Sequence, residues 1–345
     1  MQDTPSHTSH AATGSASNPA SHSASHSASP SMAQLASRGQ TPAYRGIWVP
    51  LVTPFLPGST NTSDAPVDHA ALRRLVAHYR RSGIAGLVIC GTTGEAAALD
   101  DAEQLAVFDT VLAEAGDLPV IAGLAGNHMG HTLARLDAFN ALPLAGVLTP
   151  APYYIRPSQA GLIDWFHTLA DRSRAPLVLY DIPYRTGSTL TLDTLLTLAG
   201  HSNIRGIKDC GGNATTTQTL IADGRLSVLA GEDHQLLSTL TMGGHGAIIA
   251  SSHCRPAHFV ALYRAVQAQQ LDVARVLFHA LMPVVRLLFA EANPGPVKAW
   301  LAREGLLADV LRAPMTSASP ALAQQLVDAI AAVDVQFGAS AANAA

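Results

Sequence analysis

Charged residues and cysteines are both scarce in this sequence. Only 13% of its 345 residues are Asp, Glu, Lys or Arg, and the formal net charge is −4. This balance argues against nucleic acid or an anionic membrane surface as a partner. The three cysteines, Cys90, Cys210 and Cys254, are widely spaced and form no CxxC pair, so neither a disulfide framework nor a zinc site is indicated. We expect a cytoplasmic protein without a bound metal.

Long apolar segments are also missing. No unbroken run reaches the roughly 18 apolar residues of a membrane span. Apolar residues nevertheless make up 48% of the sequence, enough for one large core or at most two domains. The first 43 residues are different, because Ser, His, Ala, Thr and Gly dominate them without apolar periodicity or a signal-peptide pattern. We expect residues 1–43 to be a disordered, low-complexity tail, with Met32 as an alternative translation start.

From residue 44 onwards, short apolar segments alternate with longer amphipathic ones. Eight segments have the composition of strands, and they cover residues 46–55, 86–91, 119–125, 146–150, 176–182, 205–210, 226–232 and 246–252. Strands that are apolar throughout and joined by helices are typical of parallel strands buried on both faces. Eight of them favour a closed barrel over an open sheet. We therefore predict an α/β fold, a (β/α)8 TIM barrel over residues 44–270, followed by a C-terminal helical extension over 271–345.

Lys208 stands near the end of the sixth predicted strand, in the segment RGIKDC. An ammonium group is costly to bury unless it is paired or becomes neutral. A pKa lowered by burial leaves a free amine, which is the form that attacks a carbonyl to make a Schiff base. The alternative is a side chain that reaches solvent or an ion pair. Catalytic groups lie at the C-terminal strand ends in this fold, which favours the first interpretation.

Other polar side chains fall at the same strand ends. Thr92 and Thr93 belong to the segment GTTGE, whose hydroxyl and backbone N–H groups suit a small carboxylate, although Thr and Gly also cap helices. Tyr180 can relay a proton to and from a carbinolamine, or simply pack. Arg185 can bind a second carboxylate through two hydrogen bonds, or form a surface salt bridge. Gly231 also falls at a strand end, and we expect it to line the substrate site.

Seven segments form a collinear set: LVTPF at 51–55, GTTGEA at 91–96, TPAPYYIRPSQ at 149–159, YDIPYRTG at 180–187, GIKD at 206–209, GGHGAI at 243–248 and ANPGPVK at 292–298. In this order and spacing the sequence resembles the class I pyruvate-dependent aldolase family, which includes dihydrodipicolinate synthase and N-acetylneuraminate lyase. The resemblance covers about residues 45–335. It implies a (β/α)8 barrel without metal or organic cofactor, usually assembled as a homotetramer from two tight dimers.

The resemblance also implies a role for each site residue. Lys208 would form the Schiff base with pyruvate, Thr93 would bind the pyruvate carboxylate, and the carbonyl group of Ile248 would face the bound ketoacid. Tyr180 would be the proton-relay residue. Thr92 would link it to Tyr154, a tyrosine contributed across the dimer interface.

Arg185 indicates the identity of the second substrate. In the synthase branch of the family this position holds the carboxylate of L-aspartate 4-semialdehyde, and the product, 4-hydroxy-tetrahydrodipicolinate, serves lysine and diaminopimelate biosynthesis. Asp181, Tyr184 and Ile155 depart from the usual synthase pattern, as does the DCGG segment that begins at residue 209. An aldolase for a related sugar acid or hydroxy-ketoacid is the alternative activity. A catalytically silent barrel that binds a ketoacid is the alternative outside enzymes.

Feedback inhibition by lysine is not expected. In lysine-sensitive relatives the resemblance places a serine, two histidines, an asparagine and a glutamate around the effector. Here the corresponding residues are Ala96, Asp101, Gln104, Asn127 and His131. The ammonium groups of lysine need an anion or several acceptors when they leave water, and the glutamate is missing. We therefore predict an enzyme that is insensitive to millimolar L-lysine.

Overall fold

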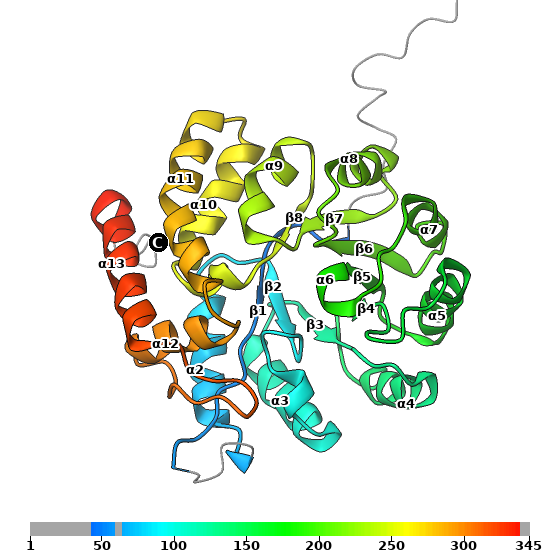
Figure 1. The fold of residues 1–345 in the computed structure, drawn as a ribbon, viewed down its shortest axis with the longest axis horizontal. Coiled ribbons are helices and arrows are strands. Elements are labelled where there is room, and N and C mark those ends of the chain that lie inside the picture. Colours follow the sequence, from blue (N-terminus) through cyan, green and yellow to red (C-terminus); the bar gives the residue numbers. More distant parts are fainter. Residues whose placement is uncertain (1–42, 59–63, 339–345) are drawn as a thin grey trace, which may run out of the picture. The chain divides into compact units, whose positions relative to one another are not determined.

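The computed structural model describes residues 43–58 and 64–338, so that the predicted disordered tail, Met32 included, lies almost entirely outside the described residues. Eight parallel strands close into a barrel in the order β1 to β8, as predicted (Figure 1). The strands are β1 Gly46–Pro50, β2 Gly86–Ile89, β3 Val120–Gly123, β4 Gly146–Pro150, β5 Leu177–Asp181, β6 Ile204–Asp209, β7 Ser227–Ala230 and β8 Gly246–Ile248.

Helices follow the strands, most of them around the outside of the barrel, whereas the short α6 lies over the barrel mouth (Figure 1). They are α2 His69–Arg80, α3 Asp101–Ala115, α4 Met129–Phe139, α5 Gln159–Arg172, α6 Pro183–Thr186, α7 Leu192–Leu198, α8 Ala214–Asp223, α9 Leu236–Thr241 and α10 Pro256–Gln267, with short 3-10 turns η2 Ala96–Ala98, η3 Asp233–Gln235 and η4 Ala250–His253. The helices α11 Leu271–Leu288, α12 Gly295–Arg303 and α13 Pro320–Phe337 follow the barrel. Several start where the sequence offers a cap. The side chain of Asp68, for example, accepts a hydrogen bond from the Ala71 N–H group at 2.9 Å.

The first strand is shorter than the predicted segment 46–55, because it ends at Pro50. Proline has no N–H group to donate to a neighbouring strand, and a second proline follows at position 54. The chain instead turns across the barrel end, where the Thr53 hydroxyl donates to the Gly94 carbonyl oxygen at 2.7 Å. Phe55 then forms an isolated antiparallel bridge with Val67.

Alternate residues of each strand face opposite sides of the barrel wall. In β5, Leu177 and Leu179 belong to the large cluster between strands and helices, whereas Val178 and Tyr180 belong to a separate cluster inside the barrel. The parallel register pairs Tyr180 with Lys208 on β6. Both side chains are therefore directed toward the barrel interior at its C-terminal end.

The C-terminal extension is fastened to the loop after β2 by buried charges. The ammonium group of Lys298 on α12 pairs with the carboxylate of Glu95 and donates to the Val310 carbonyl oxygen at 2.9 Å. Arg312 binds the Ala65 carbonyl oxygen at 2.9 Å and pairs with Glu103 on α3. Buried charges persist only when they are paired in this way, so these contacts fix the GTTGE loop to α12. Within the described part of the chain, no helix is long and apolar enough to cross a membrane.

Candidate active site

Lys208 is the central group at the C-terminal end of the barrel. Only 8% of the residue is exposed, and its Nζ atom lies 4.3 Å from the centre of the Tyr180 ring. Burial lowers the pKa of Lys208, although the nearby acids Glu232 and Asp233 oppose this shift. Asp233 is itself buried, which raises its pKa to about 6, and its carboxylate accepts from the Ser251 N–H group at 2.7 Å. The amine is therefore shifted toward the neutral, nucleophilic form.

The glycine at position 231 lets the chain pass close to this lysine. A Cβ atom at Gly231 would lie 2.9 Å from the Lys208 Cγ atom and 2.4 Å from the Cys210 Sγ atom. Both distances are too short for a real side chain, so any larger residue would displace the nucleophile. The structure therefore places Gly231 against the stem of Lys208, next to the predicted site.

Tyr180 is suited to hold and deliver a proton. Burial raises the pKa of Tyr180 well above its ordinary value, and the nearby Cys210 thiol raises it further. The phenol therefore stays protonated at neutral pH. A proton donor beside an attacking amine is what carbinolamine formation and its collapse require.

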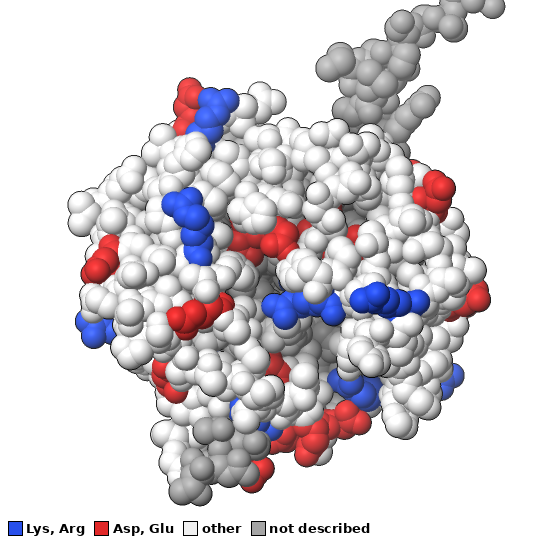
Figure 2. Space-filling model, in the orientation of Figure 1, with Lys and Arg blue, Asp and Glu red and all other residues white. Residues whose placement is uncertain are grey.

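Arg185 lies at the mouth of the barrel on the short helix α6, where the sequence alone predicts a loop. The residue is exposed, and its guanidinium carbon lies 5.8 Å from the centre of the Tyr184 ring. Figure 2 shows a hollow over the centre of this face, with acidic side chains beside β7 and β8 and basic side chains beside α6. The mouth therefore has a positive side that can receive a carboxylate.

The GTTGE loop follows β2 at the same end of the barrel. Thr93 is buried, and its hydroxyl oxygen accepts from the Asn293 side-chain amide at 3.0 Å. Glu95 has a left-handed backbone, with φ of 52°, and turns its carboxylate toward Lys298. Left-handed backbone is uncommon outside glycine, so this turn is held by the buried ion pair. The pair thereby positions Thr93.

Among the described residues, no hydrogen bond, ion pair or ring contact joins Lys208 to Thr92, Tyr154 or Ile248. The side chain of Thr92 is exposed, and Tyr154 is 88% exposed, with a strained φ of 73°. The backbone N–H group of Tyr154 donates to the Thr186 carbonyl oxygen at 3.0 Å, which holds the tyrosine out from the rim. Ile248 is fully buried in β8, in the cluster that contains Tyr180.

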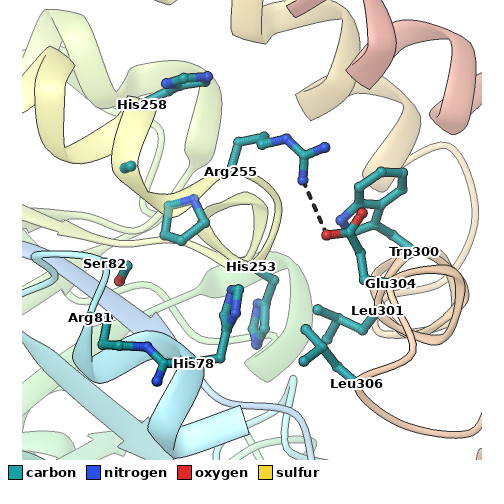
Figure 3. A pocket seen from close by; sticks show the side chains of 12 residues that line it. His78, Arg81, Ser82, His253, Arg255, His258, Trp300, Leu301, Glu304 and Leu306 are labelled. Carbon is teal, nitrogen blue, oxygen red and sulfur yellow. Dashed lines mark hydrogen bonds and ion pairs between the residues drawn. The ribbon is translucent and has the colours of Figure 1, made fainter. Parts of the chain in front are cut away.

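A separate cavity of about 180 Å³ lies outside the barrel, between α2, α10 and α12 (Figure 3). Its arginine, Arg255, already pairs with Glu304 at 3.3 Å and with Asp334. Its buried histidine, His253, has both ring nitrogens bound to backbone groups, and burial lowers its pKa to about 4. These groups hold α10 to the C-terminal extension.

Two residues of the site were missed by sequence reasoning. Cys210 is buried in the cluster that contains Tyr180, and it lies two residues beyond Lys208 on the same face of the strand end. The side-chain period of a strand was the available signal. Glu232 lies next to Gly231, and its carboxylate accepts from the Tyr184 hydroxyl at 2.8 Å. Nothing in the local pattern links Glu232 to position 184, which is distant in sequence.

A buried lysine with a lowered pKa, next to a protonated tyrosine at the C-terminal mouth of a closed parallel barrel, defines a class of protein, the lyases that act through a Schiff base. The arginine on the rim further indicates substrates that carry carboxylates. Residues 43–333 match the model of the dihydrodipicolinate synthetase family, and the chain belongs to that family.

Individual relatives agree with this assignment. The chain is 34% identical over 288 residues to 4-hydroxy-tetrahydrodipicolinate synthase 2 of Clostridium acetobutylicum, a match that covers 81% of this chain and 97% of the relative. It is 37% identical to the 4-hydroxy-tetrahydrodipicolinate synthase of Sorangium cellulosum, covering 86% of this chain and 98% of that protein. Among solved structures, the synthase of Methylacidiphilum fumariolicum SolV superposes with a TM-score of 0.80 at 31% identity, covering 85% of this chain and 97% of the other.

Proposed function

We propose that this protein condenses pyruvate with L-aspartate 4-semialdehyde to give 4-hydroxy-tetrahydrodipicolinate. The observation that carries the proposal is the position of Lys208, buried beside Tyr180 and facing a mouth that presents Arg185. Membership of the dihydrodipicolinate synthetase family and the names of its relatives support the same reaction.

The first step is imine formation. The neutral Nζ atom of Lys208 attacks C2 of pyruvate, and Tyr180 donates a proton to the C2 oxygen, which gives a carbinolamine. Tyr180 then takes one proton from the amine nitrogen and returns it to the C2 oxygen. The C2–O bond breaks, water leaves, and the protonated imine keeps the second amine proton. In this proposal the hydroxyl group of Thr93 and the backbone N–H groups of its loop bind the pyruvate carboxylate.

The second step forms the carbon–carbon bond. The protonated imine withdraws electrons from C3, so that loss of a C3 proton gives an enamine. The enamine carbon attacks the aldehyde carbon of the second substrate, whose carboxylate is held by Arg185, and the aldehyde oxygen takes up a proton. The amino group of the semialdehyde then attacks C2, displaces the Lys208 amine and closes the ring.

We further propose that the enzyme is a homotetramer built from dimers, in which Tyr154 of one protomer reaches Thr92 of its neighbour. The high exposure and strained backbone of Tyr154 support this arrangement, since a large aromatic side chain is held away from its own chain. One solved relative is described as a monomeric variant, so assembly differs among relatives. The reaction has no need of a metal or organic cofactor, and we place it in the cytoplasm.

Two measurements test the activity. Borohydride reduction in the presence of pyruvate should add the mass of reduced pyruvate to the peptide that contains Lys208, and the absence of an adduct would favour a silent barrel. Turnover should then be measured with pyruvate and a panel of aldehydes. Aspartate semialdehyde should rank first, and a sugar-derived aldehyde that ranks above it would favour the alternative aldolase.

A further inference from the structure

A hydrogen bond spans the end of the strand that carries Lys208. Strand β6 lies between β5 and β7 in the barrel. Tyr184 follows β5, and Glu232 follows β7. The Tyr184 hydroxyl donates to Glu232 Oε1 at 2.8 Å, so the Tyr184–Glu232 bridge crosses from one neighbouring strand end to the other.

Both ends of the bridge are held by the backbone. Tyr184 lies in α6, which starts at Pro183 and ends where the Gly187 N–H group donates to the Pro183 carbonyl oxygen at 2.8 Å. The Glu232 carbonyl oxygen accepts from the Gln235 N–H group at 3.0 Å at the start of η3. The bridge therefore joins two ordered turns, and moving it requires breaking its own hydrogen bond.

The tyrosine ring limits the space beside Arg185. The ring is 66% exposed on the rim, and its centre lies 5.8 Å from the Arg185 guanidinium carbon. A second substrate must extend from the Lys208 imine to Arg185. A longer chain would have to pass the ring and break the hydrogen bond to Glu232.

We propose that the Tyr184–Glu232 bridge selects the second substrate by length, admitting a four-carbon carboxylated aldehyde and excluding longer ones. The inference rests on the proposed function, because it assumes that the imine forms on Lys208 and that Arg185 holds the far carboxylate. Tyr184 then acts as a specificity-determining residue, and Glu232 acts as the residue that positions it.

Borohydride trapping of linear 2-oxo dicarboxylates tests the proposal without requiring turnover. Pyruvate and a four-carbon aldehyde together give a seven-carbon skeleton, so 2-oxoheptanedioate mimics the open-chain condensation product, and 2-oxononanedioate mimics one made from a longer aldehyde. The concentration that gives half-maximal adduct on Lys208 is measured for each acid. In the wild type we expect this half-maximal concentration to be at least about tenfold higher for the nine-carbon acid than for the seven-carbon acid.

The variants separate the ring from the hydrogen bond. Tyr184→Ser should abolish most of this difference, with trapping of pyruvate unchanged. Tyr184→Phe should give an intermediate difference, because its ring remains but is no longer anchored. Glu232→Gln keeps an acceptor and should keep the difference. Tyr153→Ser, which removes another exposed tyrosine from the rim, is the matched control and should behave as the wild type.

The results distinguish the two proposals. The role of the bridge would be overturned if the two acids still differed in half-maximal concentration in Tyr184→Ser, or if they did not differ in the wild type. Either result leaves the Schiff-base function intact as long as pyruvate is still trapped. A wild type that forms no pyruvate adduct would overturn the Schiff-base function itself, and the length filter with it. Loss of pyruvate trapping in Tyr184→Ser alone would show that Tyr184 supports the lysine and not the second substrate.

Discussion

The Nζ atom of Lys208 lies 4.3 Å from the centre of the Tyr180 ring, and the two residues are direct partners in the register of β5 and β6. One strand pair therefore fixes the nucleophile relative to the proton donor. Burial acts on the two groups in a complementary way, because it lowers the pKa of the amine and raises the pKa of the phenol. Both shifts favour the uncharged form of each group, which is the form that imine formation needs.

Replacing Lys208 by Ala should abolish the borohydride adduct with pyruvate. The chain has only one other lysine, Lys298, and this residue is fully buried and paired with Glu95. Mass spectrometry of the reduced wild type should accordingly find the adduct only on the Lys208 peptide. Residual turnover near the wild-type rate in Lys208→Ala would contradict the assignment.

Arg185→Ala should selectively weaken the binding of the second substrate. The change removes a charged hydrogen bond worth on the order of 1.5–3 kcal/mol, and kcat/KM for the aldehyde should fall accordingly. Pyruvate trapping should be unchanged. Arg185→Lys keeps the charge but not the paired N–H groups and should recover only part of the loss. Equal losses for both substrates would mean that Arg185 supports the fold.

Lys298→Met should destabilise the protein strongly. It leaves the Glu95 carboxylate buried without its cation, at a cost of about 3–5 kcal/mol. The double variant Glu95→Gln with Lys298→Met should recover much of this loss, because no uncompensated charge remains. Urea unfolding of the wild type, Lys298→Met and the double variant measures the differences in unfolding free energy. If Lys298→Met is as stable as the wild type, the pair is energetically neutral.

Asp181→Asn should change the pH dependence of stability. Burial raises the pKa of Asp181 to about 7, and neighbouring Asp209 adds to the shift, whereas the Leu190 N–H group opposes it. Because the folded pKa is above the unfolded value, the folded state binds the proton more tightly, and stability from this group is lost as pH rises from about 4 to 7. The variant should therefore gain on the order of 2 kcal/mol relative to the wild type between pH 5 and pH 8. The same difference in unfolding free energy between variant and wild type at pH 5 and at pH 8 would contradict this prediction.

L-Lysine should not inhibit the enzyme at millimolar concentration. Asp101, the acid among the five residues that correspond to the effector site, pairs with Arg135 at 3.2 Å, and Arg135 also donates to Gln104. The predicted effector region therefore already contains a cation. Half-inhibition below about 1 mM, or roughly −4 kcal/mol of binding, would refute the prediction. The relative from Cyanidioschyzon merolae, whose structure has lysine bound, is a positive control for binding.

The sequence by itself determined the barrel and predicted the position of its nucleophile. Eight apolar segments separated by amphipathic ones favour buried parallel strands, and a lysine at the end of one of them must be paired or become neutral if it is buried. Both signals are local, since each depends on residues within one element. The end of β1 at Pro50 was missed, although the prolines at positions 50 and 54 were the signal.

Only the tertiary structure decided how the site is enclosed. The Tyr184–Glu232 bridge joins residues that follow two different strands, and the Lys298–Glu95 pair joins the helical extension to the loop after β2. Cys210 reaches Tyr180 and Gly231 only because β5, β6 and β7 are neighbours in the closed barrel. Such contacts depend on strand order and register, which bring together side chains that no local periodicity connects.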